Sequence, residues 1–161
     1  IKNCIVRKDI VFDIIKKTPG VSYNEIGRET GLSNGVISHY LIKLMDSGEV
    51  EKNGTSRGKY FLKNVPKKDR TIITLLRNKT NNEIFKFLMK NFNDGKIVTQ
   101  NEISKKIKKS ASTISVSLKT LQKNNIIERV IMNQNVKISS DIGYRILNGK
   151  ISENHIIKYN L

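Results

Sequence analysis

The chain has 161 residues, and 30 Lys and Arg side chains against 14 Asp and Glu leave a net charge of +16 at pH 7. With 37% hydrophobic residues it can build the core of one domain or two small ones, which excludes a disordered polycation. The sequence has no apolar run of bilayer-spanning length and no signal-peptide pattern. A single Cys and two distant His argue against disulfides and zinc. The charge favours a polyanionic partner, with nucleic acid ahead of an anionic membrane surface.

An internal repeat sets the domain organisation. After a first predicted helix over 9–17, stopped by Pro19-Gly20, the segment 21–52 recurs as 98–129 without a gap, and ten of 32 aligned positions are identical. We therefore expect two related domains, 1–64 and 65–161, the second with extra flanking helices. Residues 1–65 carry a net charge of +4 and residues 66–161 carry +12, so the second domain should dominate electrostatic attraction.

Both repeats predict the same two helices. Ser22-x-x-Glu25 and Thr99-x-x-Glu102 are capping boxes that begin the first helix of each repeat, which should end at Gly31 and around Lys109. Ser33 and Ser110 are expected to cap the second helix. Its apolar stripe then has the same spacing in both repeats, at Ile37, Leu41 and Leu44 and at Ile114, Leu118 and Leu121.

A β-hairpin pattern follows each repeat. The first hairpin turns at Asn53-Gly54, and the second runs through 127–132 and returns over 136–139. Further helices are predicted over 68–77 and 82–91. One more is predicted after Ser140 from the apolar residues Ile142, Ile146 and Leu147. The expected fold class is mainly α with small β-hairpin wings, an α+β arrangement.

This order of elements, and the residues themselves, resemble winged helix-turn-helix proteins. ArsR- and MarR-type transcription regulators are similar to GLSNGVISHYLIKLMDSGEV at 31–50 and SASTISVSLKTLQKNNIIER at 110–129. The entry helix of ArsR-type domains is similar to LLRNKTNNEIFKFLMKN at 75–91. The post-wing segment that opens the last helix of MarR- and PadR-type proteins is similar to ISSDIGYRIL at 138–147. Tandem chains of this size and composition resemble archaeal regulators.

The resemblance implies that one face of the second helix of each repeat enters the major groove of DNA. At 100° per residue, the face opposite the apolar stripe carries Gly35, His39, Ile42 and Asp46 in the first repeat, and Ser112, Val116, Lys119 and Lys123 in the second. Small polar and apolar groups near the helix start suit bases, and lysines further along suit phosphates. The first set suits DNA less well, because Asp46 would repel a phosphate.

Basic residues outside these helices complete the expected interface. Lysines end the supporting helix of the second domain, and Arg57 could enter a minor groove from the tip of the first wing. The expected DNA contacts of the first domain are Asn34, Gly35, Ser38, His39, Lys43, Arg57 and Lys59. Those of the second domain are Lys105, Lys106, Lys109, Ser112, Thr113, Ser115, Val116, Lys119, Lys123, Arg129 and Lys137.

We therefore expect a transcription regulator that binds double-stranded DNA through two winged helices. We expect no enzymatic activity, cofactor, metal or membrane partner, and a cytoplasmic, nucleoid-associated location. Two alternatives stay open. One winged helix could serve as a protein-interaction or homodimerisation module in a transcription or chromatin assembly, through the face that carries Ile42 and Asp46. The chain could also be a low-specificity architectural DNA binder.

Overall fold

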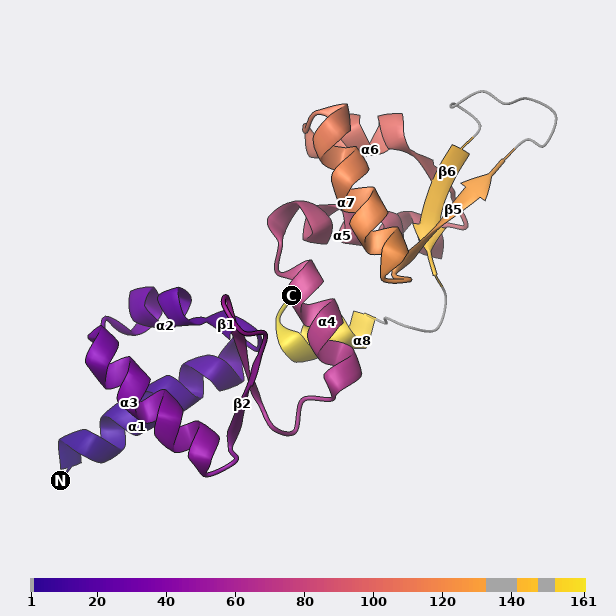
Figure 1. The fold of residues 1–161 in the computed structure, drawn as a ribbon. Helices are drawn as coiled ribbons and strands as arrows, with labels where there is room; N and C mark the ends of the chain where they lie inside the picture. Colours follow the sequence, from indigo (N-terminus) through magenta and orange to yellow (C-terminus); the bar gives the residue numbers. More distant parts are fainter. Residues whose placement is uncertain (1, 133–141, 148–152) are drawn as a thin grey trace. The chain divides into compact units, whose positions relative to one another are not determined.

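A computed structural model describes residues 2–132, 142–147 and 153–161 of the chain (Figure 1). They form two compact units: unit 1 consists of residues 1–74 and 157–160, and unit 2 of residues 75–156 and 161. The division falls later than the expected boundary between residues 64 and 65. The reason is that the first turns of the helix after the first wing are held by unit 1, through the buried side chains of Asp69 and Arg70.

Unit 1 surrounds its core with helices and one small sheet. Its elements are α1 (Lys2–Lys17), β1 (Val21–Ser22), α2 (Tyr23–Thr30), α3 (Asn34–Asp46), β2 (Val50–Asn53), β3 (Lys59–Leu62), the start of α4 (Lys67–Leu76) and the end of α8 (Glu153–Tyr159). The three strands are antiparallel in the order β1-β3-β2, with Val21 opposite Tyr60 and Val50 opposite Leu62. Helices α2 and α3 pack on α1, which also contacts β3.

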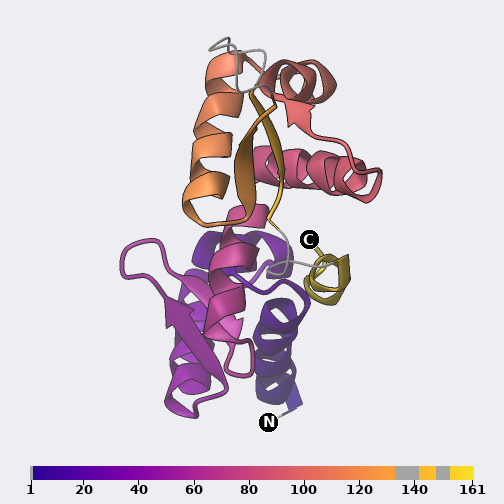
Figure 2. The ribbon, with the colours of Figure 1, turned by 90° about the vertical axis from the view of Figure 1, so that its right-hand side faces the viewer.

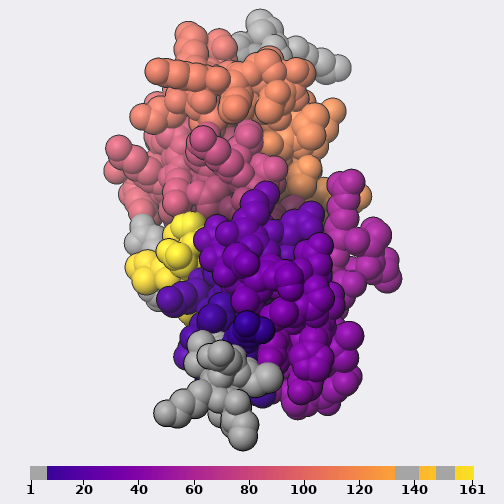
Figure 3. All heavy atoms as spheres, turned by 90° about the vertical axis from the view of Figure 1, so that its left-hand side faces the viewer, coloured from indigo at the N-terminus to yellow at the C-terminus, as the bar shows by residue number. Residues whose placement is uncertain are grey.

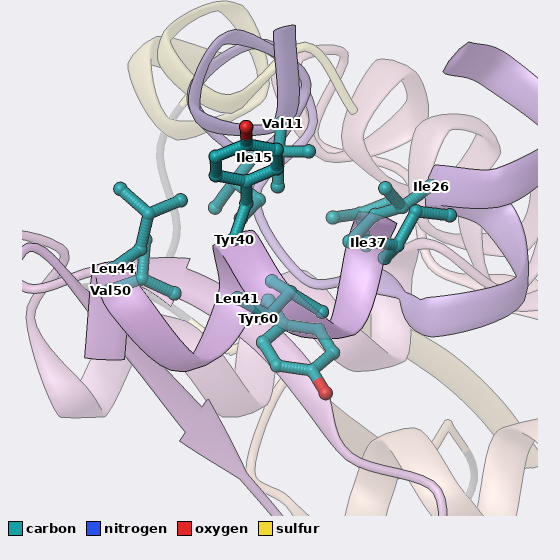
Figure 4. Packing of buried hydrophobic residues seen from close by; sticks show 10 residues of the cluster. Val11, Ile15, Ile26, Ile37, Tyr40, Leu41, Leu44, Val50 and Tyr60 are labelled. Atoms are coloured by element: carbon teal, nitrogen blue, oxygen red, sulfur yellow. The ribbon is translucent and has the colours of Figure 1, made fainter. Parts of the chain in front are cut away.

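The core of unit 1 is the apolar stripe of α3 and its partners. Ile37, Leu41 and Leu44 are at most 2% exposed, as the helical spacing requires. Figure 4 shows them packed with Val11 and Ile15 of α1, Ile26 of α2, Tyr40 of α3, Val50 of β2 and Tyr60 of β3. Burying this stripe fixes which face of α3 is left for solvent.

Unit 2 repeats this arrangement. Its elements are α5 (Lys79–Asn93), β4 (Val98–Thr99), α6 (Gln100–Ile107), α7 (Ala111–Lys123), β5 (Ile127–Ile131) and β6 (Ile142–Ile146), with sheet order β4-β6-β5. Helix α5 takes the place of α1 and packs on α6, α7 and β6. Ile114, Leu118 and Leu121 of α7 are buried, as predicted. Two mainly helical units with small antiparallel hairpins confirm the expected fold class.

The repeat is visible in the helix ends. Helices α6 and α7 begin and end at the positions aligned with α2 and α3. Both capping boxes form, and the helices they open end at left-handed residues, Gly31 at φ 67° and Lys108 at φ 57°. The turn after α3 uses Gly48 at φ 74°, and the aligned Asn125 adopts φ 56°, which Asn tolerates better than most residues. Ser110 caps α7 through its side chain, whereas Ser33 occupies the cap position of α3 without a side-chain hydrogen bond.

The helix predicted after Ser140 is wrong: residues 142–146 form strand β6. Ile142, Tyr144 and Ile146 alternate along it, and β6 lies between β4 and β5. Gly143 permits the close approach of β4, because a Cβ atom there would lie 2.2 Å from Cγ2 of Ile97. The helix start implied by the likeness of ISSDIGYRIL is wrong for residues 142–146 for the same reason, and residues 138–141 lie outside the described residues. The predicted return strand at 136–139 lies outside the described residues.

Arg70 of α4 joins that helix to the first wing. Its side chain is 2% exposed, and its Nη1 atom donates to Oε2 of Glu51 at 2.7 Å and to Oδ1 of Asn53 at 3.1 Å. Its Nε atom donates to the carbonyl oxygen of Val65 at 3.0 Å. The guanidinium also lies over the ring of Phe61, 5.4 Å from the centroid. In unit 2 the aligned glutamate, Glu128, pairs with Arg145 of the neighbouring strand instead.

Candidate nucleic-acid interface

The face of α3 opposite the core is open to solvent. Asn34, Gly35, His39 and Lys43 are exposed there, and Ser38 is half-buried. Ile42 is 54% exposed, so this apolar side chain lies on the outward face as the helical geometry predicts. The ring of His39 meets the edge of Tyr40, with 5.0 Å between centroids. This face of α3 therefore presents polar side chains suited to hydrogen bonds with bases, together with one apolar side chain.

Tyr23 connects the start of α2 to the start of α3. Its hydroxyl donates to the carbonyl oxygen of Asn34 at 2.7 Å, and it also lies 2.8 Å from the hydroxyl of Ser38. The Tyr23 hydroxyl has one proton, and the carbonyl can only accept, so Ser38 must donate in the second bond. The proton of Ser38 is therefore engaged, and its oxygen is left to accept a hydrogen bond from DNA.

Gln100 makes the equivalent hydrogen bond in unit 2, from the start of α6 to the start of α7. It is aligned with Tyr23, and its Nε2 atom donates at 3.1 Å to the carbonyl oxygen of Ala111, the residue aligned with Asn34. Neither Tyr23 nor Gln100 was among the expected site residues. The signal that could have found them is a long hydrogen-bonding side chain at the first position of the helix in both repeats.

The outward face of α7 holds the expected residues of unit 2. Ser112, Thr113, Lys119 and Lys123 are exposed, and Val116 is 65% exposed. Ser115, which the alignment places with Ser38, is half-buried. The small residues occupy the first turns and the lysines the last ones, as predicted from the spacing.

The first wing forms a hollow with the start of α2. Its loop projects from unit 1 in both Figure 2 and Figure 3, where it is purple to magenta. Residues of α2 and of the wing line a hollow of about 510 Å³, namely Ser22, Tyr23, Asn24, Lys52, Ser56, Arg57, Gly58, Lys59 and Tyr60. Lys52 donates to the carbonyl oxygen of Thr55 at 3.2 Å, and Lys59 lies 4.0 Å from Glu25. Arg57 is exposed at the rim, so the hollow is cationic.

A second hollow lies between α7 and the second wing. It measures about 320 Å³ and is lined by Gln100, Ser115, Lys119, Gln122, Arg129, Ile142 and Tyr144. Three expected site residues thus come together there: Ser115, Lys119 and Arg129. Lys105, Lys106 and Lys109, which are exposed at the end of α6, are not among its lining residues. Lys137 lies outside the described residues.

The two helix pairs differ sharply in charge. Residues 100–123, covering α6 and α7, contain six lysines and one glutamate, a net charge of +5. The aligned residues 23–46, covering α2 and α3, carry a net charge of −1. The single glutamate of the second set, Glu102, is committed to its cap. The backbone N–H of Thr99 donates to it and, with Lys96, holds the pKa of the carboxyl below its ordinary value.

No three His, Cys, Asp or Glu side chains within residues 2–132, 142–147 and 153–161 lie together so as to hold a metal ion. No helix in the same ranges is long and apolar enough to cross a membrane.

Comparison with protein families finds one family model that matches two separate segments of the chain. The family model described as winged helix-turn-helix DNA-binding matches residues 8–51 and 77–128. Each matched segment runs from the helix before the repeat, α1 or α5, to the first strand of the wing, so the two matches coincide with the two units. A comparison with curated proteins found no relative that matches the chain.

Proposed function

The chain belongs to the winged helix-turn-helix DNA-binding family, and from this premise we propose how its two units divide the work of binding DNA. It is a DNA-binding regulator whose partner is duplex DNA. Unit 2 supplies most of the electrostatic affinity, through α6 and α7. Unit 1 adds contacts from α3 and from its wing.

One observation carries this proposal: the charge of +5 on residues 100–123 against −1 on residues 23–46. The two segments have the same helices at the same aligned positions, so the difference lies in the surface and not in the fold. Each phosphate neutralised by Lys or Arg releases counterions, and this release supplies a large part of DNA affinity. Lys119 and Lys123 lie beyond the base-facing turns of α7, where the backbone of DNA would pass.

Regulation of transcription is the function that this family membership supports, and we propose no catalytic role. A regulator of this kind binds chromosomal DNA, so the proposal includes the expected cytoplasmic, nucleoid-associated location. A homodimer or a contact with the transcription machinery would add to the DNA contacts and would not replace them.

The test compares two double variants across a salt titration. In one, Lys119 and Lys123 become Ala; in the other, Ile42 and Asp46 become Ala. All four side chains are exposed, so neither change empties a core. Wild-type binding through six to ten phosphate contacts should weaken by roughly a thousandfold or more between 50 and 200 mM salt. The lysine variant should lose about 0.9 of the log–log salt slope for each phosphate contact removed.

The second variant is the matched control. Removing Asp46 should leave DNA affinity unchanged or slightly higher, because a carboxylate near phosphate is repulsive. Sedimentation of the same variant reports whether Ile42 takes part in self-association. Flat affinity of the wild type across the salt range would contradict DNA binding itself. A normal slope in the lysine variant, with binding lost in the other, would reverse the ranking of the two units.

A further inference from the structure

The base-facing positions of α3 and α7 differ in one chemical respect. Where α3 presents the amide of Asn34 and the imidazole of His39, the aligned positions of α7 present the methyl groups of Ala111 and Val116. All four residues are exposed. The first turns of α7 therefore lack the amide and guanidinium groups that form paired hydrogen bonds with adenine or guanine.

The hydroxyl groups at the start of α7 are bonded to one another. Oγ of Ser110, the cap of α7, lies 2.8 Å from Oγ1 of Thr113 and 3.1 Å from Oγ of Ser112. Two turns after Thr113, Thr120 donates to the carbonyl oxygen of Val116 at 3.0 Å. These bonds engage the hydroxyl groups at the helix start, and the exposed methyl groups of Ala111 and Val116 lie beside them.

Val116 does little to stabilise the fold. It is 65% exposed, so it contributes little to the core. A β-branched side chain also has a lower helix propensity than Ala or Lys, so it does not stabilise α7 locally. Lys119 and Lys123 follow on the same face, which makes an apolar protein partner a poor match and a polyanion a good one.

Duplex DNA is a polyanion that carries methyl groups in its major groove. The C5 methyl of thymine is the one apolar group presented there by the four bases, and small apolar side chains contact it. We propose that α7 reads thymine methyl groups through Val116, supported by Ala111 and Thr113, so that unit 2 selects A·T-rich duplexes. This proposal rests on the proposed function and specifies the DNA that unit 2 prefers.

The experiment removes only the methyl group from the DNA. The full chain is titrated against the alternating copolymers poly(dA-dT) and poly(dA-dU), which differ at C5 alone, at one fixed salt concentration. Affinity should fall by about fourfold for each methyl group that leaves the contact. In the reverse arm, poly(dG-5-methyl-dC) should bind more tightly than poly(dG-dC), because the methyl group returns at the same ring position.

Two matched variants assign the effect to α7. Val116→Ala removes the exposed side chain and improves helix propensity, so the unit should fold as before, and it should lower the T-to-U affinity ratio at least twofold. Ile157→Ala, at a 78% exposed apolar residue of α8 outside the DNA-facing helices, should leave that ratio unchanged. A ratio that persists undiminished in Val116→Ala would come from altered duplex shape and would overturn the proposal.

The outcomes separate this proposal from the function beneath it. Salt-dependent binding with equal affinity for thymine and uracil duplexes would overturn methyl reading and leave DNA binding intact. A loss of the thymine preference in Ile42→Ala rather than in Val116→Ala would overturn the assignment to unit 2. A failure to bind any of the four duplexes, even at low salt, would overturn both.

Discussion

Gly27 and Ser104 occupy the same aligned position, in the middle of α2 and α6, and both are small. A Cβ atom on Gly27 would meet Cδ1 of Ile37 at 3.6 Å, which is an ordinary van der Waals contact, so the helix crossing has room for a methyl group. Ser104 fills that position in unit 2, but its Oγ atom is buried and has no hydrogen-bond partner among the described residues. Neither residue is the best side chain for its place.

Substitution by Ala at either position should therefore raise the free energy of unfolding. Gly27→Ala restricts the unfolded chain and favours the helix, and it should raise the free energy of unfolding by about 0.5–1 kcal/mol. Ser104→Ala removes a buried hydroxyl without a partner and should raise that free energy by about 1 kcal/mol or more. Urea unfolding of each variant against the wild type measures both changes.

Gly31→Ala is the opposite control. No atom of the described residues lies within 4 Å of a Cβ atom at Gly31, yet its φ of 67° disfavours any side chain with a Cβ. This change should lower the free energy of unfolding by about 1 kcal/mol. A stabilised Gly31→Ala, or a destabilised Gly27→Ala, would show that backbone conformation and helix packing have been assigned to the wrong residues.

At the level of elements, a helix or strand could be predicted where its own residues carry the signal for it. The helices of both repeats were predictable because each carries its own cap and its own stripe, and one capping box supports the other. Strand β6 was not, because Ile142, Ile146 and Leu147 fit a helical stripe as well as Ile142, Tyr144 and Ile146 fit alternation. Its pairing with β4, far away in sequence and permitted by Gly143, decided between the two.

The candidate site divides in the same way. The outward positions of α3 and α7 follow from helical phase alone, so their exposure was predictable. The bonds from Tyr23 and Gln100 to the starts of those helices depend on how two helices meet, which one-dimensional spacing does not contain. Arg70 was also missed, since an arginine inside an apolar helix pattern gives no sign of which strand it will reach.

Arg70 should be the most sensitive charged residue of unit 1. Replacing it with Met removes the cation that bonds to Glu51, Asn53 and the carbonyl of Val65. We expect the free energy of unfolding to fall by about 1–3 kcal/mol, mainly because the carbonyl of Val65 loses its buried donor, whereas the half-exposed Glu51 can be hydrated. Arg70→Lys should recover only part of this loss, since an ammonium lacks the planar fork.

Arg129→Lys provides the comparison for Arg70. Its side chain is exposed on β5, and the same substitution there should change the free energy of unfolding by less than about 0.5 kcal/mol. Thermal or urea unfolding of the three variants measures the contrast. Equal stability of Arg70→Met and the wild type would mean that α4 is held to the first wing by apolar packing alone.

At the scale of the whole molecule, one hydrogen bond links two distant parts of the chain within unit 1. The hydroxyl of Tyr159 in α8 donates to Oδ2 of Asp69 in α4 at 2.6 Å, and both side chains are buried. Burial, with this bond to the carboxylate, raises the pKa of Tyr159 to about 12. A raised pKa means that the folded state favours the protonated hydroxyl, so the stabilisation is complete below pH 10 and is lost as the pH rises through 12.

Tyr159→Phe should reproduce that loss at neutral pH. We expect the free energy of unfolding to fall by about 2 kcal/mol, the usual range for a hydrogen bond to a charged group. The difference between wild type and variant should stay constant below pH 10 and shrink between pH 10 and 12. Urea unfolding at a series of pH values measures it. A difference that persists undiminished at pH 12 would show that the hydroxyl does not titrate in the folded state as described.

The contact of α8 with unit 1 affects the order in which the parts of unit 1 become available during synthesis. A ribosome adds Asp69 ninety residues before Tyr159, an interval of roughly 5–20 s at about 5–20 residues per second. Every residue of unit 2 up to β6 has been made before the last helix of unit 1 is available. Helices α5, α6 and α7 and the sheet of unit 2 are thus all synthesised while unit 1 still lacks its part of α8. A translation product that stops after β6 would carry a finished set of α6, α7 and wing residues beside a first unit still lacking its Tyr159 bond.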